Sequence, residues 1–193
     1  MAGKRQFDEQ QVLDRVTELF RHRGYAATSI DDLVRETGLS RGSLYSTFGG
    51  KAELFALVLE RYRAYMMGTL QERMTGDEPR EAVRSLLVGL LDTLALSGRP
   101  GGCLVTNTVA EADDTPTEIM ASARTGLAQQ EAQLSEYLHA AKAAEMLPAD
   151  ADPLRLARYF VGIRQAVGVL WRAGVDREQI VATIDVSVSV LDR

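Results

Sequence analysis

The chain has 193 residues, of which 46% are hydrophobic and 25% charged, and its formal net charge is −5. This composition excludes an intrinsically disordered chain, and without an apolar run of roughly 18 residues a membrane-spanning protein is not expected. A single cysteine, Cys103, excludes an internal disulfide, and the start lacks an apolar signal region, so we expect a cytoplasmic protein that does not contact membranes.

The charge is unevenly distributed along the chain. Residues 1–51 contain 8 Lys or Arg and 7 Asp or Glu, a net +1, whereas residues 52–193 contain 14 and 20, a net −6. A near-neutral N-terminal part permits nucleic-acid binding, but the binding would rest on a few well-placed donors. Lys4 and Arg5 are either a short basic arm that reaches DNA or a solvated terminus.

The N-terminal residues predict three helices. Apolar residues at helical spacing predict the first over 8–23, ended by Gly24. In the stretch 28–51, Thr28 or Ser29 caps a second short helix that Gly38 ends, and a third begins at Ser40. The inward face of the third helix is expected to carry Leu44, Tyr45 and Phe48. The opposite face carries small and donor side chains, as in a helix that enters a major groove.

The remaining residues predict six further helices and no strand. After Gly49 and Gly50, an amphipathic helix over 51–74 would be about 35 Å long and would connect two domains. Further helices are expected over 79–98, within 103–112, from a capping box at 115–118 to before Pro148, over 153–173 and from 176 to the end. The predicted fold is all-α with about nine helices: a helix-turn-helix domain over 1–51, with its motif at 29–48, and a larger domain over 52–193.

The first 60 or so residues resemble a known DNA-binding domain. The runs LFRHRGYAATSI (19–30) and DDLVRETGLSRGSLYSTFGGKAEL (31–54) are similar in length, spacing and residue type to the TetR family of bacterial transcriptional regulators. This resemblance implies an all-helical homodimer in which two recognition helices read a near-palindromic double-stranded DNA operator. It also implies a variable C-terminal domain that binds a small-molecule inducer. The run GGCLVTNTVAEA (101–112) resembles one subgroup of such regulators without identifying an inducer.

The resemblance also implies which residues contact DNA. Those expected to face base edges are Arg41, Gly42 and Ser43, with Thr47 as a fourth. Those expected to hold phosphates are Thr28, Ser29, Ser40, Tyr45 and Lys51. Arginine can donate two hydrogen bonds to a guanine, so Arg41 carries the main sequence-reading hypothesis. The alternatives are that the hydroxyls only cap helices, that Tyr45 is core, that Lys51 is solvated and that Arg41 contacts a phosphate.

The larger domain is expected to bind a small hydrophobic or aromatic inducer. Inward-facing candidates for its pocket are Tyr62, Met66, Leu90, Leu94, Cys103, Asn107, Tyr137 and Trp171. Cys103 opens a short helix, where the helix dipole would favour a thiolate, so it is either a redox or electrophile sensor or an inert packing residue. Asn107 either contacts the ligand or is structural. The expected function is a repressor released by its inducer, and an activator is the alternative.

The last two long helices are the expected dimer interface, because each is apolar over more than one side. The interface candidates are Phe160, Ile163, Val167, Leu170, Ile184 and Val188, and the small residues Gly162, Ala166 and Gly168 would permit close helix approach. An enzyme is not expected, because the two histidines, His22 and His139, are isolated and no metal-ligand cluster, phosphate loop or nucleophile motif is present. No cofactor and no metal site is expected.

Overall fold

A computed structural model describes residues 7–74, 78–96, 98 and 100–192. These residues form nine α-helices and two short 3-10 helices without any strand, which confirms the all-α prediction. Lys4 and Arg5 lie outside the described residues. The α-helices are α1 (Glu9–Arg23), α2 (Ile30–Thr37), α3 (Arg41–Phe48), α4 (Lys51–Arg73), α5 (Pro79–Ala95), α6 (Leu104–Ala110), α7 (Thr117–Ala143), α8 (Pro153–Arg172) and α9 (Arg177–Val188), and the 3-10 helices are η1 (Ala112–Asp114) and η2 (Ser189–Asp192).

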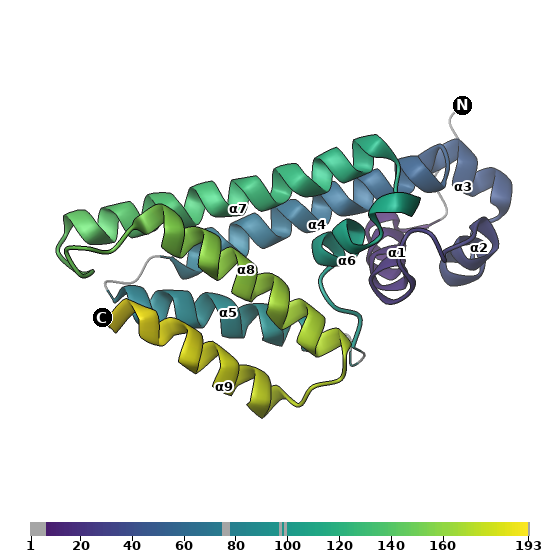
Figure 1. The fold of residues 1–193 in the computed structure, drawn as a ribbon. Helices are drawn as coiled ribbons and strands as arrows, with labels where there is room; N and C mark the ends of the chain where they lie inside the picture. The colour runs from purple at the N-terminus through teal and green to yellow at the C-terminus, as the bar shows by residue number, and fades with distance from the viewer. Residues whose placement is uncertain (1–6, 75–77, 97, 99, 193) are drawn as a thin grey trace.

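Helices α1, α2 and α3 form a small unit at one end of the molecule (Figure 1). Asp8 caps α1, since its carboxylate accepts hydrogen bonds from the backbone amides of Gln10 and Gln11. The buried face of α1 carries Val16 and Phe20, and the Phe20 ring meets Phe55 of α4 edge-on at 4.7 Å. This contact ties the three-helix unit to α4.

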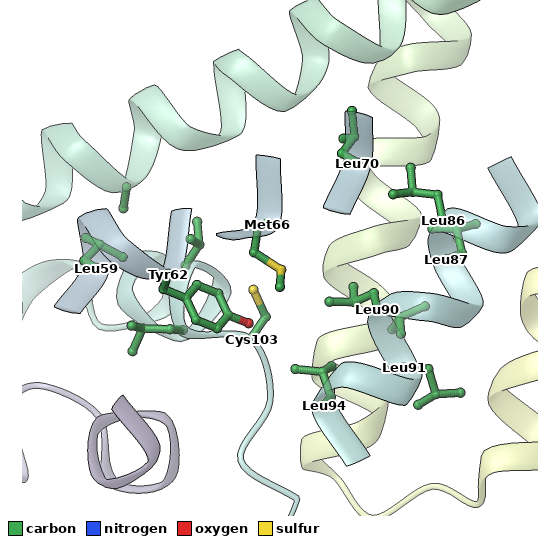
Figure 2. Close-up of a cluster of buried hydrophobic side chains, with 14 of the residues drawn as sticks. Leu59, Tyr62, Met66, Leu70, Leu86, Leu87, Leu90, Leu91, Leu94 and Cys103 are labelled. Atoms are coloured by element: carbon green, nitrogen blue, oxygen red, sulfur yellow. The ribbon is translucent and has the colours of Figure 1, made fainter. Parts of the chain in front are cut away.

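The long helix α4 leaves this unit and runs beside α7 into the larger helical part (Figure 1). There α8 packs on α7, and α5 lies against α8 and α9. Figure 2 shows buried side chains of α4 and α5, among them Leu70 of α4 beside Leu86 of α5. Helix α6 contacts α1, α4 and α7, so it lies where the small unit meets the larger part.

The predicted capping box at the start of α7 is wrong. The hydroxyl of Thr115 donates to the Glu111 carbonyl at 2.8 Å, and the helix begins at Thr117 with Pro116 in the cap position. The chain leaves α6 through η1, which turns Thr115 back towards the preceding segment instead of towards α7. A local pattern of four residues therefore predicted the right helix one residue too early.

Candidate nucleic-acid interface

Local hydrogen bonds fix the turn between α2 and α3. The Ser29 hydroxyl accepts a hydrogen bond from the Asp32 amide at 3.1 Å, and the Asp32 carboxylate accepts one from the Ser29 amide at 3.0 Å. Gly38 ends α2 in the left-handed region, with φ of 72°. Ser40 then caps α3 by accepting from the Ser43 amide at 3.1 Å. The sequence between Ser29 and Ser43 thus sets both helix starts without distant contacts.

Two apolar side chains set which face of α3 is exposed. Leu44 is fully buried and Phe48, one turn later, is 8% exposed. Tyr45 is 48% exposed, so the prediction that it faces the core is wrong. It follows Leu44 directly, and one residue along a helix turns the side chain by about 100°. The exposed face of α3 therefore presents Arg41, Gly42 and Tyr45, with Ser43 and Thr47 half-buried at its sides.

Arg41 is not free on this surface. Its guanidinium donates a hydrogen bond to the Asp31 carboxylate of α2, and both side chains of this ion pair are mostly exposed. The hydrogen bond and charge of Asp31 raise the pKa of Arg41 above its usual value. Sequence reasoning missed Asp31, because residues 31 and 41 come together only when α2 and α3 pack across the turn. A base contact by Arg41 would require this pair to open.

The residues predicted to hold phosphates occupy different environments. Thr28 is 1% exposed and its hydroxyl donates to the Gly24 carbonyl at 2.6 Å, so the prediction that this hydroxyl reaches a phosphate is wrong. It closes the turn between α1 and α2 instead. Ser29 and Ser40 are exposed helix caps, which leaves capping and phosphate contact compatible. For these serines and for Tyr45, phosphate contact stays a prediction.

Lys51 begins α4 beside the loop that follows α1. Its ammonium lies 4.2 Å from the centre of the Tyr25 ring and donates to the Ala26 carbonyl at 3.4 Å. Burial lowers the pKa of Lys51 below its usual value. Its charge therefore sits between the α1–α2 loop and the start of α4.

A set of buried polar contacts joins α6 to the end of α1. The amide of Asn107 donates to the Arg21 carbonyl at 3.0 Å and to the Gly101 carbonyl at 2.8 Å, so the structural alternative for this residue is the one observed. The Arg21 guanidinium donates to the Gly102 carbonyl at 2.9 Å. The Glu111 carboxylate accepts from the amides of Tyr25 and Ala26 at 2.8 and 3.2 Å. Sequence reasoning missed the roles of Arg21 and Glu111, because these contacts join residues more than 80 positions apart.

The predicted ligand-binding residues lie mainly in the core. Figure 2 shows the hydroxyl of Tyr62, the sulfur of Met66 and the thiol of Cys103 pointing towards one another, while Leu90 and Leu94 line the neighbouring part of α5. Tyr137 and Trp171 are half-buried and pack against the same core.

Cys103 is enclosed within the protomer. It is 7% exposed, and a Cβ at position 168 would lie only 3.1 Å from its Cβ, so Gly168 permits this close packing. Gly168, which was predicted to permit close helix approach in the dimer, therefore permits close packing of Cys103 within the protomer. The surroundings of Cys103 are those of a packing residue.

A cavity of about 420 Å³ lies between α1, α4 and α5, outside this core. Of the eight predicted ligand-binding residues, only Tyr62 lines it. Its lining consists of Asp14, Thr17, Glu18, Arg21, Arg61, Tyr62, Tyr65, Thr93 and Leu96. The cavity therefore borders both the small N-terminal unit and the larger helical part.

Most of the predicted dimer residues are buried within one protomer. Those that are at most 1% exposed are Phe160, Val167, Ile184 and Val188, while Ile163 and Leu170 are half-buried. The four buried side chains are part of the protomer's own core, so a second copy cannot reach them in this arrangement. Assigning them to the interface was wrong. The exposed apolar side chains of the two helices include Tyr159, Val169 and Val186.

The described residues contain neither a candidate membrane span nor a cluster of metal ligands. No helix there is long and apolar enough to cross a membrane. No group of three or more His, Cys, Asp or Glu side chains in the described ranges is placed to hold a metal ion.

Known proteins resemble the chain over its whole length. It is 29% identical over 194 residues to YezE of Bacillus subtilis, an uncharacterized HTH-type transcriptional regulator, with 100% of both chains covered. It is 27% identical to the HTH-type transcriptional repressor ComR of Escherichia coli, over 90% of this chain and 84% of ComR. A structure of the TetR family regulator CifR, a cysteine mutant complexed with 26-base-pair double-stranded operator DNA, is 25% identical. It superposes with a TM-score of 0.82 over 96% of this chain and 97% of CifR.

Two family models cover both parts of the chain. Residues 12–58 match the bacterial regulatory proteins of the tetR family, and residues 79–185 match the tetracyclin repressor-like C-terminal domain. The first match contains the α2–α3 unit, and the second extends from α5 into α9. The chain therefore belongs to the TetR family, whose members are DNA-binding transcriptional regulators and not enzymes.

Proposed function

We propose that this regulator binds a double-stranded DNA operator by inserting α3 into the major groove. The observation that carries the proposal is the exposed face of α3, held outward by the buried Leu44 and Phe48. Arg41 would read a guanine, Gly42 would allow the helix backbone close to the bases, and the half-buried Ser43 and Thr47 would contact the edges of the groove. The division into a DNA-binding domain (1–51) and a regulatory domain (52–193) belongs to the same proposal.

Phosphate contacts would fix the position of α3 on the duplex. Ser29 and Ser40 lie at the exposed N-terminal ends of α2 and α3, where backbone amides favour an anion. Tyr45 on the exposed face of α3 and Lys51 at the start of α4 would supply a hydroxyl and a charge. Because the N-terminal part carries a net charge of only +1, few phosphate contacts are available to each protomer. Tight binding would therefore depend on two protomers acting together.

We infer a homodimer formed through α8 and α9. Tyr159, Gly162, Ala166 and Val169 follow one another at three- and four-residue spacing on α8, and none of them is fully buried. Nothing lies within 4 Å of a Cβ added at Gly162, so a second helix could approach closely there. Together with Val186 of α9 these residues replace the buried ones predicted from the sequence. A two-fold dimer would place two α3 helices on a near-palindromic operator, with half-sites about 34–36 Å apart or a multiple of that distance.

The proposed regulatory step is release of the operator when a small molecule binds the larger domain. Helices α4 and α6 connect the two parts: α4 is shared by both, and α6 holds the end of α1 through Asn107 and Glu111. A ligand that moved α4 or α6 would change the separation of the two α3 helices and break their match to the operator. Such a protein would act as a repressor in the cytoplasm. Activation is the alternative that the same geometry permits.

A mobility-shift assay with the DNA upstream of the protein's own gene tests the DNA-binding proposal. We expect the wild-type protein to bind this DNA and an Arg41→Ala, Tyr45→Ala double variant to lose binding while keeping its helical circular-dichroism spectrum. Arg124→Ala is the matched control, because Arg124 is an exposed arginine on α7, outside α3 and the proposed dimer helices, and its removal should leave binding unchanged. Full binding by the double variant would contradict the assignment of α3 as the recognition helix.

A further inference from the structure

Arg164 of α8 is a buried cation without an anionic partner among the described residues. It is 4% exposed, and its guanidinium donates to the Gln130 side-chain oxygen at 3.1 Å and to the Met66 sulfur at 3.4 Å. None of the ion pairs between described residues includes Arg164. Burial lowers the pKa of Arg164 below its usual value, which reflects the cost of enclosing this charge. An amide oxygen and a thioether sulfur are weak compensation for the lost hydration.

Two other buried arginines show how this protein compensates such a charge when the role is structural. Arg21 is 4% exposed and pairs with Glu18 at 2.6 Å, and it also donates to a backbone carbonyl. Arg63 is 8% exposed and pairs with Glu60 at 3.0 Å, with further hydrogen bonds to side chains of α7. Each of these two has a carboxylate partner. Arg164 differs from both in this respect, because its charge has no carboxylate partner among the described residues.

The neighbouring groups supply a second hydrogen-bond donor. The Tyr62 hydroxyl is buried and makes no hydrogen bond to a described residue that meets normal geometry. Burial raises the pKa of Tyr62 well above its usual value, so this hydroxyl keeps its proton and can donate it. It points towards Cys103 and Met66, and the Met66 sulfur in turn contacts Arg164 (Figure 2). A cation and an unused hydroxyl thus lie around an otherwise apolar centre between α4, α8 and the start of α6.

We propose that Arg164 and Tyr62 bind the carboxylate of a small monocarboxylic acid, whose apolar body packs beside Met66 and Cys103. One arginine matches one negative charge, whereas a phosphate dianion would bring a second charge into an apolar core with no cation to match it. This inference rests on the proposed ligand response and gives the inducer a chemical class: the apolar body expected from the sequence carries an acid group.

The surface cavity between α1, α4 and α5 gives an approach to this cluster. Tyr62 lines that cavity, and its hydroxyl points inward towards Cys103 and Met66, the residue that contacts Arg164. A turn of this one side chain would open the cavity towards Met66 and Arg164. The bound acid would then touch α4 through Met66 and the start of α6 through Cys103. These are the helices that hold the DNA-binding unit.

Thermal unfolding with benzoate and hexanoate tests the proposal, with benzamide and hexanamide as neutral controls of the same shape. We expect at least one of the two acids to raise the wild-type Tm by about 3 °C or more at millimolar concentration, and its amide to leave Tm unchanged. In Arg164→Met, the same Tm shift should need an acid concentration at least about tenfold higher, since a charge-assisted hydrogen bond to the carboxylate is lost. Arg63→Met is the matched control and should keep the response. Equal shifts by acids and amides, no shift by either acid, or a full response in Arg164→Met would overturn the proposal.

The stability of the unliganded protein gives a second readout that needs no ligand. A variant with Arg164→Met and Gln130→Met removes the charge together with its amide partner. If the charge is kept for a ligand, this variant should have an unchanged or higher Tm, whereas Arg63→Met should have a lower one. A fall as large as that of Arg63→Met would assign Arg164 a structural role and overturn the proposal. Both readouts are independent of DNA, so failure to bind an operator would count against the proposed function alone.

Discussion

Replacing Asn107 by aspartate should destabilise the junction between α6 and α1. The Asn107 amide nitrogen makes two hydrogen bonds, to the carbonyls of Arg21 and Gly101, and the side chain is only 7% exposed. The Arg21 carbonyl belongs to the last turn of α1, where carbonyls have no partner within the helix. Asn107→Asp keeps the shape but removes both N–H donors and turns an oxygen towards two carbonyl oxygens.

The expected loss combines two terms. Each hydrogen bond is worth about 1 kcal/mol, and two buried carbonyls left without a donor add to the cost, so we expect a loss of about 3 kcal/mol in the free energy of unfolding. For a chain of this size this corresponds to a fall in Tm of about 6–12 °C. Because native domains are stable by about 5–15 kcal/mol, the variant should still fold.

Thermal and urea unfolding followed by circular dichroism would measure this loss. Thr125→Val is a suitable control, because Thr125 is exposed on α7 and its hydroxyl bonds only to the Ala121 carbonyl of its own helix. The control should change Tm by less than about 2 °C. If Asn107→Asp melted within about 2 °C of the wild type, the two contacts would not stabilise the junction, and the reasoning would be refuted.

Three further predictions concern the α2–α3 unit. Asp31→Asn should tighten operator binding up to about fivefold in a mobility-shift assay at low salt, because it releases Arg41 and removes a carboxylate near DNA phosphates; weaker binding would argue that the ion pair positions Arg41. The pKa of Asp32 lies well below its usual 3.8, chiefly through the hydrogen bond from the Ser29 side chain and then that from the Ser29 amide. The stabilisation from this ionised carboxylate is present above pH 3.8 and is lost as the pH falls below it, so acid unfolding of Asp32→Asn should depend less on pH than that of the wild type. Leu44→Ala should cost about 2–5 kcal/mol and abolish operator binding, because the only fully buried side chain of α3 is lost; a variant with unchanged Tm would contradict this.

Local features of the molecule were readable from the sequence. The starts of α2 and α3 depend on Ser29 and Ser40, and the end of α2 depends on Gly38, all through contacts within three or four residues. Apolar residues spaced three and four positions apart likewise predicted an all-α fold, since this spacing places them on one face of a helix, where they are buried together. The start of α7 is the exception, because there a contact from Thr115 back to Glu111 replaced the expected cap.

The tertiary structure alone decided which partner covers each apolar or polar face. Periodicity predicts that Phe160 and Ile184 are buried, but it does not show whether the protomer's own core or a second copy buries them. In the structure α8 packs on α5 and α7, and α9 packs on α5, so both side chains are buried in the protomer's own core. The contact of Glu111 with the loop after α1 and the uncompensated charge of Arg164 have no sequence signature either. Such features depend on groups that lie far apart along the chain, and only folding brings those groups within hydrogen-bond distance or leaves a charge without a counter-charge.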